Sequence, residues 1–155
     1  MFKMTRKAGV TLGLGLLAAC TVVLAADNHG LLNPGATNVI DLPNGGRVVE
    51  IASSGFNIMG DTSDPLHTSN MNCDGTTESD PDGNTVQGGG FCTLADKDHD
   101  AIWLWWAMDA DGGTWSVFAG TGKYEGATGS GTWEFGEQWP DGKIENNWRG
   151  DIILK

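Results

Sequence analysis

The chain has 155 residues, a length that suits one domain. It carries 20 acidic and 9 basic residues, which give a net charge of −11 with histidine neutral. A surface this negative repels nucleic acids and anionic lipid headgroups, so both are excluded as partners. A neutral or cationic ligand is compatible with this charge.

Residues 1–26 have the pattern of an export signal. Three basic residues near the start precede an uncharged apolar run, which ends in the small residues Ala25 and Ala26. That order predicts a cleaved signal peptide, and its removal leaves 6 basic and 20 acidic residues, a net charge of −14. A membrane anchor is the alternative, because the run 8–26 is just long enough to span a bilayer. We expect no integral membrane span after processing.

A second processing route is open at Cys20. The sequence "LAAC" that ends there is similar to the lipobox of bacterial lipoproteins, in which the cysteine is lipidated and becomes the first residue. The apolar run continues past Cys20, which favours simple cleavage near Ala25 or Ala26. Either route takes the protein out of the cytoplasm, so we expect a periplasmic or secreted protein.

Cys73 and Cys92 are the two cysteines that remain after either route. Two thiols in an oxidising compartment most often form one disulfide, so the sequence predicts a Cys73–Cys92 bond. A metal pair is the alternative, but no His or Cys lies at ligand spacing from either residue. We expect no metal and no cofactor.

The remainder of the chain has the pattern of β-structure, with no long stretch of apolar residues at helical spacing. Residues 27–45, rich in Asn, Gly and Pro, are expected as an extended lead-in, and residues 46–155 as one barrel domain. Residues 74–90 are almost wholly turn formers and are expected as a mobile loop. Strands are predicted within 46–55, 64–75, 90–98, 100–109, 114–120, 131–139 and 146–155.

Short Gly and Asp turns join these strands, as in an antiparallel meander. A meander of about eight strands on one small domain tends to close into a barrel, which leaves no exposed edges. The predicted fold class is therefore all-β: an antiparallel meander closed into a small, calycin-like β-barrel.

The segment "GTGKYEGATGSGTW", residues 120–133, places five glycines around one Lys and one Tyr. A phosphate-binding loop needs Ser or Thr after its Gly-Lys pair, but Tyr124 follows Lys123. The dinucleotide fingerprint also fails, because Glu125 stands where its last glycine belongs. We expect these glycines to serve the shape of the backbone at strand ends and bends.

Together with the preceding "CTLADKDHDAIWLWW", this segment resembles the allene oxide cyclase barrel-like superfamily. It is most similar to small exported bacterial members that share the cysteine, the acidic turn, the aromatic strand and "GTGKYxGATGxG"; plant dirigent proteins are more distant. The resemblance covers roughly residues 45–155. It implies an eight-stranded antiparallel barrel with an apolar cavity. Members include cofactor-free cyclases and stereo-directing proteins, and the catalytic residues of the plant enzymes have no assignable counterpart here.

Seven tryptophans in one small domain form the strongest candidate for a binding surface. Along the strand 100–109, alternation puts Trp106 on one face and Trp103 and Trp105 on the other. An eight-stranded barrel has room for core side chains or for one small ligand, and an indole is costly filler because its N–H needs a partner. The candidate ligand-binding residues are Trp103, Trp105, Trp106, Trp115, Trp133 and Trp148.

Ionisable residues give a weaker signal. His67, Tyr124, Glu134 and Arg149 are candidate catalytic residues, which could act as acid, base or anion clamp if they pointed inward. There is no Ser-His-Asp order and no His pair for zinc. The acidic turn "DKDHD" is similar to a fragment of a calcium loop, but it lacks the required Gly and Glu, and Asp also suits tight turns.

The sequence therefore predicts an exported barrel that binds a small apolar or aromatic molecule in its cavity. The alternative is a cofactor-free isomerase, cyclase or lyase that uses the same cavity, with Tyr124, Glu134 and Arg149 handling protons. A homo-oligomer with tryptophans at the interface is the third hypothesis. An ionisable residue facing the cavity would favour the enzyme, and tryptophans on the outer face would favour the oligomer.

Overall fold

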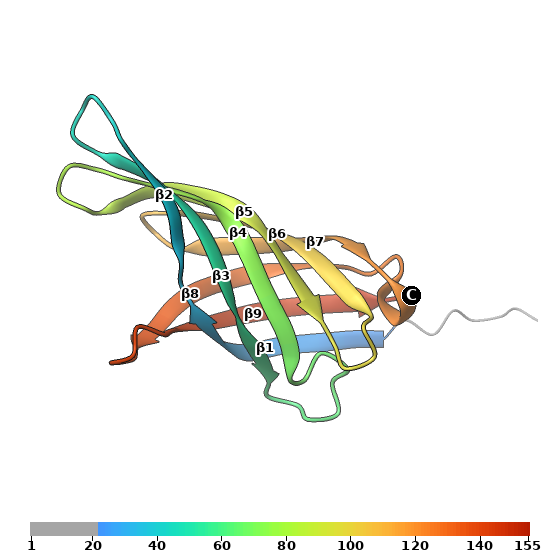
Figure 1. Ribbon diagram of the computed structural model, residues 1–155. Helices are drawn as coiled ribbons and strands as arrows, with labels where there is room; N and C mark the ends of the chain where they lie inside the picture. Colours follow the sequence, from blue (N-terminus) through green and yellow to red (C-terminus); the bar gives the residue numbers. More distant parts are fainter. Residues whose placement is uncertain (1–21) are drawn as a thin grey trace, which may run out of the picture.

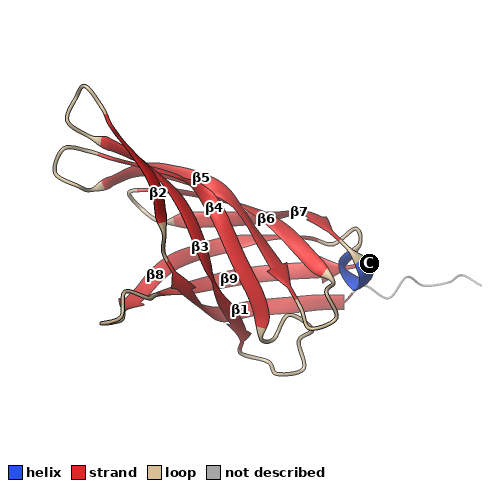
Figure 2. Cartoon of the chain, in the orientation of Figure 1, coloured by secondary structure: helices blue, strands red, loops and turns tan. Residues whose placement is uncertain are grey.

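The computed structural model describes residues 22–155, which fold almost entirely into strands (Figure 2). Most of the predicted signal segment, including Cys20, lies outside these residues. One short 3₁₀ helix, η1 (Gly122–Tyr124), interrupts the sheet. Within residues 22–155, no helix has the length and apolar character needed to cross a membrane. The strands are β1 (Val22–Asn33), β2 (Ala36–Asp41), β3 (Arg47–Met59), β4 (Ser69–Ser79), β5 (Thr85–Ala95), β6 (Ala101–Asp109), β7 (Gly113–Gly120), β8 (Thr128–Gln138) and β9 (Ile144–Leu154).

Eight of these strands close into an antiparallel barrel (Figure 1). Their order around the barrel is β1-β9-β8-β7-β6-β5-β4-β3, and β3 pairs back onto β1. β1 closes the barrel because its residues from Asn28 to Asn33 are paired with β3, while most of the strand is paired with β9. The predicted all-β barrel is confirmed.

β2 lies outside the closed barrel. It pairs with the first part of β3, beyond the point where β1 ends, and the β2–β3 and β4–β5 hairpins extend past the barrel (Figure 1). The segment 27–45, expected as an extended lead-in, thus contributes most of β1 and all of β2 to the sheet. Since β1 begins at Val22, cleavage near Ala25 or Ala26 would remove its first residues.

The segment 74–90 is not the mobile loop that its composition suggested. It forms the second half of β4 and the first half of β5 around a short turn. Its glycines permit close approach: a Cβ on Gly90 would collide with the backbone of β4, and one on Gly75 with the ring of Trp106. These two glycines therefore reflect lack of space beside a neighbouring strand or ring, and only the residues between Ser79 and Thr85 form a turn.

The barrel has one filled end and one hollow end. At the filled end, the β3–β4 loop, the β5–β6 turn and η1 cover the interior, where Leu66, Ile102 and Tyr124 are fully buried. At the opposite end, the interior is bordered by residues next to the β4–β5, β6–β7 and β8–β9 turns and remains open. The hollow end is the candidate site.

Candidate functional site

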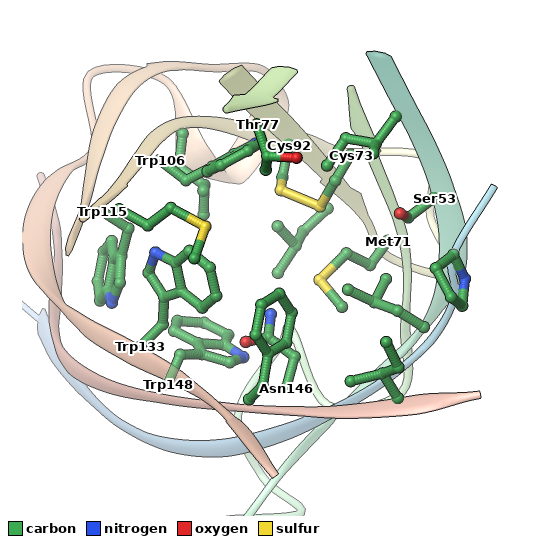
Figure 3. A pocket seen from close by; sticks show the side chains of 18 of the residues that line it. Ser53, Met71, Cys73, Thr77, Cys92, Trp106, Trp115, Trp133, Asn146 and Trp148 are labelled. Carbon is green, nitrogen blue, oxygen red and sulfur yellow. A yellow bond between two sulfur atoms is a disulfide. The ribbon is translucent and has the colours of Figure 1, made fainter. Parts of the chain in front are cut away.

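A cavity of about 250 Å³ occupies the hollow end of the barrel (Figure 3). All eight barrel strands contribute side chains to its wall, and β6, β7, β8 and β9 each contribute one tryptophan: Trp106, Trp115, Trp133 and Trp148. The cavity exceeds the ~150 Å³ that holds benzene in an engineered protein core and lies just below the ~300 Å³ of the smallest drug-sized sites. Its size therefore suits one molecule of one or two rings.

The four cavity indoles pack in two perpendicular pairs. The ring centroids of Trp106 and Trp133 are 5.9 Å apart at an interplanar angle of 87°, and those of Trp115 and Trp148 are 5.3 Å apart at 89°. Phe135 adds a fifth ring, at 5.0 Å from Trp133. In such pairs the edge of one ring meets the face of the other, so the rings hold one another along one side of the cavity.

Hydrogen bonds fix three of the four indoles. Trp115 Nε1 donates to the carbonyl oxygen of Arg149 at 3.1 Å, and Trp133 Nε1 donates to that of Thr114 at 3.1 Å. Trp148 Nε1 donates to Oδ1 of the buried Asn57 at 2.8 Å. The fourth, Trp106, is also buried, but its Nε1 has no acceptor among the described residues. It is a buried donor without a hydrogen-bond partner in this part of the chain.

Glycines make room for these rings. A Cβ on Gly113 would lie 2.5 Å from Cδ2 of Trp133. On Gly131 and on Gly150 it would lie 2.7 Å from atoms of the Trp115 indole. Such separations are far below normal contact, so the indoles lie directly against strand backbone. The sequence indicates a role in backbone shape for these glycines, but their pairing with tryptophans depends on which strands become neighbours.

The predicted disulfide is confirmed, and it forms part of the cavity wall. Cys73 on β4 lies directly opposite Cys92 on β5, with Cα atoms 4.0 Å apart and the sulfurs bonded. Both residues are buried and line the cavity, as Figure 3 shows. The bond therefore ties together the wall that faces the tryptophans.

Few polar atoms face the cavity, and none of them is charged. Ser53, Thr77 and Thr85 contribute hydroxyl groups, and Asn146 contributes an amide whose Oδ1 has no hydrogen-bond partner within residues 22–155. None of the described residues that line the cavity has an ionisable side chain, apart from the cysteines held in the disulfide.

Two of the six predicted tryptophans lie on the outer face of β6. Trp105 is 51% exposed, and its ring stacks on Phe118 with centroids 4.6 Å apart and contacts the edge of Phe91 at 6.2 Å. Trp103 lies on the same face and does not line the cavity. The predicted division of the strand into two faces is therefore what the structure shows, with Trp106 pointing inward.

Tyr124 lies at the filled end, away from the cavity. Its buried hydroxyl donates to Asp96 Oδ2 at 2.8 Å, and Lys123 Nζ lies 2.9 Å from the same oxygen. Burial favours the protonated form of Asp96, but the bonds from Lys123 and Tyr124 outweigh it and hold the pKa of Asp96 below its ordinary value. Burial and the bond to Asp96 raise the pKa of Tyr124 above its usual range. This arrangement fastens η1 onto the barrel.

The acidic turn after β5 is organised by the same carboxylate. Asp96 Oδ1 accepts the backbone N–H of Asp98 at 2.8 Å and that of Asp100 at 3.2 Å. These are the local bonds by which Asp stabilises tight turns, and the structural role expected for this segment is what is observed.

The other candidate catalytic residues are also placed outside the cavity. Glu134 and Arg149 lie on the outer face, 65% and 68% exposed, with Oε1 and Nη2 3.9 Å apart. His67 is half-buried in the β3–β4 loop, where its Nδ1 lies 2.9 Å from the carbonyl oxygen of Met59. The structure therefore does not bring His67, Tyr124, Glu134 and Arg149 together around one space.

This chain is similar in fold to a solved protein structure. Among solved structures, the pterocarpan synthase dirigent protein GePTS1 matches with a TM-score of 0.51 over 97% of this chain and 97% of its own, at 15% identity. No family model and no curated protein matches the chain. Membership of the small exported bacterial branch stays a prediction. The barrel of this chain is dirigent-like in fold.

Proposed function

We propose that the protein binds one small apolar or aromatic molecule in the barrel cavity. The observation that carries this proposal is the cavity of about 250 Å³ with its four tryptophans. Protein interiors are normally close-packed, and an eight-stranded barrel has room either for core side chains or for one small ligand. A barrel built for stability alone would fill this space with side chains.

Two buried polar atoms of the cavity wall lack hydrogen-bond partners within residues 22–155. Trp106 Nε1 is a donor without an acceptor, and Asn146 Oδ1 is an acceptor without a donor. An unpaired buried polar group costs about 1–3 kcal/mol, so a ligand that shifts the wall enough to pair with either atom is favoured, and the hydroxyl groups of Ser53, Thr77 and Thr85 are further polar groups in the lining. A largely apolar molecule with one polar group suits such a wall.

Binding, or the steering of a bound molecule, is favoured over proton-transfer chemistry. General acid–base catalysis needs an ionisable group within hydrogen-bond reach of the substrate. The described lining contains none, and the four candidate catalytic residues lie elsewhere. The dirigent-like fold is compatible with a barrel that binds or directs a small molecule.

We further propose that the protein is exported. The basic, apolar and small-residue order of residues 1–26 supports this, and so does a disulfide, which persists in oxidising compartments. Intact mass of the protein from cell fractions tests it. The mass of a chain that begins near Asp27 would indicate simple cleavage. The mass of a lipid-modified chain that begins at Cys20 would indicate a lipid anchor. An unprocessed chain in the cytoplasm would contradict export.

Binding is tested by titration with naphthalene, a neutral two-ring probe, followed by tryptophan fluorescence and calorimetry. We expect saturable quenching with a Kd of about 10 µM, which is about −7 kcal/mol or about −0.7 kcal/mol per non-hydrogen atom. Trp106→Leu should weaken binding by about 1–3 kcal/mol while retaining an apolar side chain at the cavity wall. Trp105→Leu is the matched control on the opposite face of the same strand. Equal effects of the two variants, or no saturation, would contradict the proposal.

A further inference from the structure

The mouth of the cavity opens into a shallow vestibule. This depression shares Thr85, Met108, Trp133 and Phe135 with the cavity wall. Its remaining lining comes from the β6–β7 turn and from the neighbouring ends of β5 and β8. A ligand that enters through this side therefore passes the vestibule before it meets the indoles.

Three acidic residues border that entrance, with the Glu134 carboxylate on the outer face of the barrel. Asp109, Asp111 and Glu134 line the vestibule, and no Lys, Arg or His is among its described lining. Glu134 is 3.9 Å from Arg149, whereas Asp109 and Asp111 form no ion pair within residues 22–155. The chain without residues 1–26 has a net charge of −14. Low-dielectric concavities lined by one sign of charge concentrate ligands of the opposite sign.

The interior would not accept an anion. No described residue in the cavity wall carries a positive charge, and an unpaired buried charge is strongly disfavoured. The wall instead contains four indole rings, and the π face is the negative part of an aromatic ring. Cations, and quaternary ammonium groups in particular, bind over the faces of tryptophan rings. Asn146 Oδ1 adds a further electronegative atom without a partner.

We infer that the cavity takes an organic cation: a quaternary ammonium or protonated amine attached to an apolar or aromatic body of one or two rings. This inference rests on the proposed binding function and specifies its ligand class. The vestibule carboxylates attract the charge, and the indoles of Trp106, Trp115, Trp133 and Trp148 replace part of its hydration shell (Figure 3).

Three probes of nearly the same shape and different charge test the inference. They are phenyltrimethylammonium, which is positive, tert-butylbenzene, which is neutral, and benzenesulfonate, which is negative. Tryptophan fluorescence at low salt should give a Kd for phenyltrimethylammonium about tenfold below that of tert-butylbenzene. Benzenesulfonate should bind at least about tenfold more weakly than tert-butylbenzene.

A charge variant tests the vestibule. In Asp109→Asn/Asp111→Asn, the amide oxygen at 109 can still accept the turn bonds from the backbone N–H of residues 111 and 112. This variant should weaken the binding of phenyltrimethylammonium roughly twofold per carboxylate removed, for a carboxylate–ammonium separation on the order of 10 Å in water. The binding of tert-butylbenzene should not change. Glu125→Gln/Asp151→Asn removes the same charge from exposed positions near the filled end and is the matched control.

The outcomes separate the two proposals. If tert-butylbenzene binds as tightly as the cation or more tightly, the ligand-class inference is overturned and the binding function stands. If none of the three probes saturates and naphthalene also fails, the binding function falls and the inference falls with it. If the vestibule variant and its control weaken the binding of phenyltrimethylammonium equally, the carboxylates at the mouth have no special role, and that part of the inference is refuted.

Discussion

Gly113 is where one added methyl group tests the cavity wall most directly. A Cβ there would lie 2.5 Å from Cδ2 of Trp133 and closer still to Cε2 and Nε1, so all three nearest atoms belong to one ring. Gly113→Ala must therefore displace the Trp133 indole together with its hydrogen bond to Thr114. Overpacking costs about 1–3 kcal/mol and a lost hydrogen bond about 1 kcal/mol. We expect the free energy of unfolding to fall by about 2–4 kcal/mol.

Thermal and urea unfolding measure this change. A domain of this size loses about 4 °C of Tm per kcal/mol, so the expected fall is about 8–16 °C. Gly89→Ala is the matched control on a strand, because the nearest atom to an added Cβ there is the carbonyl oxygen of Trp106 at 3.3 Å; its effect should stay within about 1 kcal/mol. In a Trp133→Leu background, Gly113→Ala should lower the free energy of unfolding by at least about 1 kcal/mol less than it does in the wild-type protein. Equal costs in both backgrounds would refute the reasoning.

Three further predictions concern the disulfide, the filled end and the glycine segment. Reduction of Cys73–Cys92 should lower the free energy of unfolding by about 3 kcal/mol, and thiol labelling of the unfolded, unreduced protein should find neither residue. Tyr124→Phe removes a hydrogen bond to the charged Asp96 and should cost about 1.5–3 kcal/mol at pH 7. The folded-state pKa of Tyr124 is raised and that of Asp96 is lowered. Urea titrations should therefore show the difference from wild type shrinking above about pH 10, where unfolded Tyr124 ionises, and below about pH 4, where Asp96 protonates; a difference independent of pH would contradict this. ATP, NAD and phosphate should leave the Tm unchanged, since the glycine segment serves backbone shape; a concentration-dependent rise with any of them would overturn that assignment.

Alternation along β6 was enough to separate Trp106 from Trp105, because successive side chains of a strand point to opposite faces. It could not identify the inner face, since both faces are apolar. That choice is made by distant strands: Trp106 meets Trp133, which comes from β8. The glycine segment behaved similarly. Positive φ angles at Gly122 and Gly126 fit the expected bends, but the contact of Gly131 with the Trp115 indole appears only when β7 and β8 are side by side.

The expectation of a mobile loop over residues 74–90, which the structure contradicts, rested on local composition. Residues 74–90 contain many turn formers, yet pairing between β4 and β5 overrides their low strand propensity. Tyr124 was a candidate acid or base on the condition that its side chain pointed into the cavity, and the structure places it at the filled end. Its burial depends on Asp96, which lies 28 residues earlier in the sequence. A local sequence pattern around Tyr124 cannot reveal a hydrogen-bond partner that is 28 residues away in the sequence.

The position of β1 has a consequence for how the chain folds. Val22 lies opposite Leu154, so the seam between β1 and β9 joins segments from opposite ends of the described sequence. Non-local pairings of this kind close late and slow the folding reaction. Until β9 is in place, an incomplete barrel presents its indoles to other chains and is prone to aggregate. A circular permutant that links Leu154 to Asp27, the first residue after the predicted cleavage, through a short linker and opens the β4–β5 turn would make this seam a local hairpin. We expect it to refold faster and with less aggregation than the natural order.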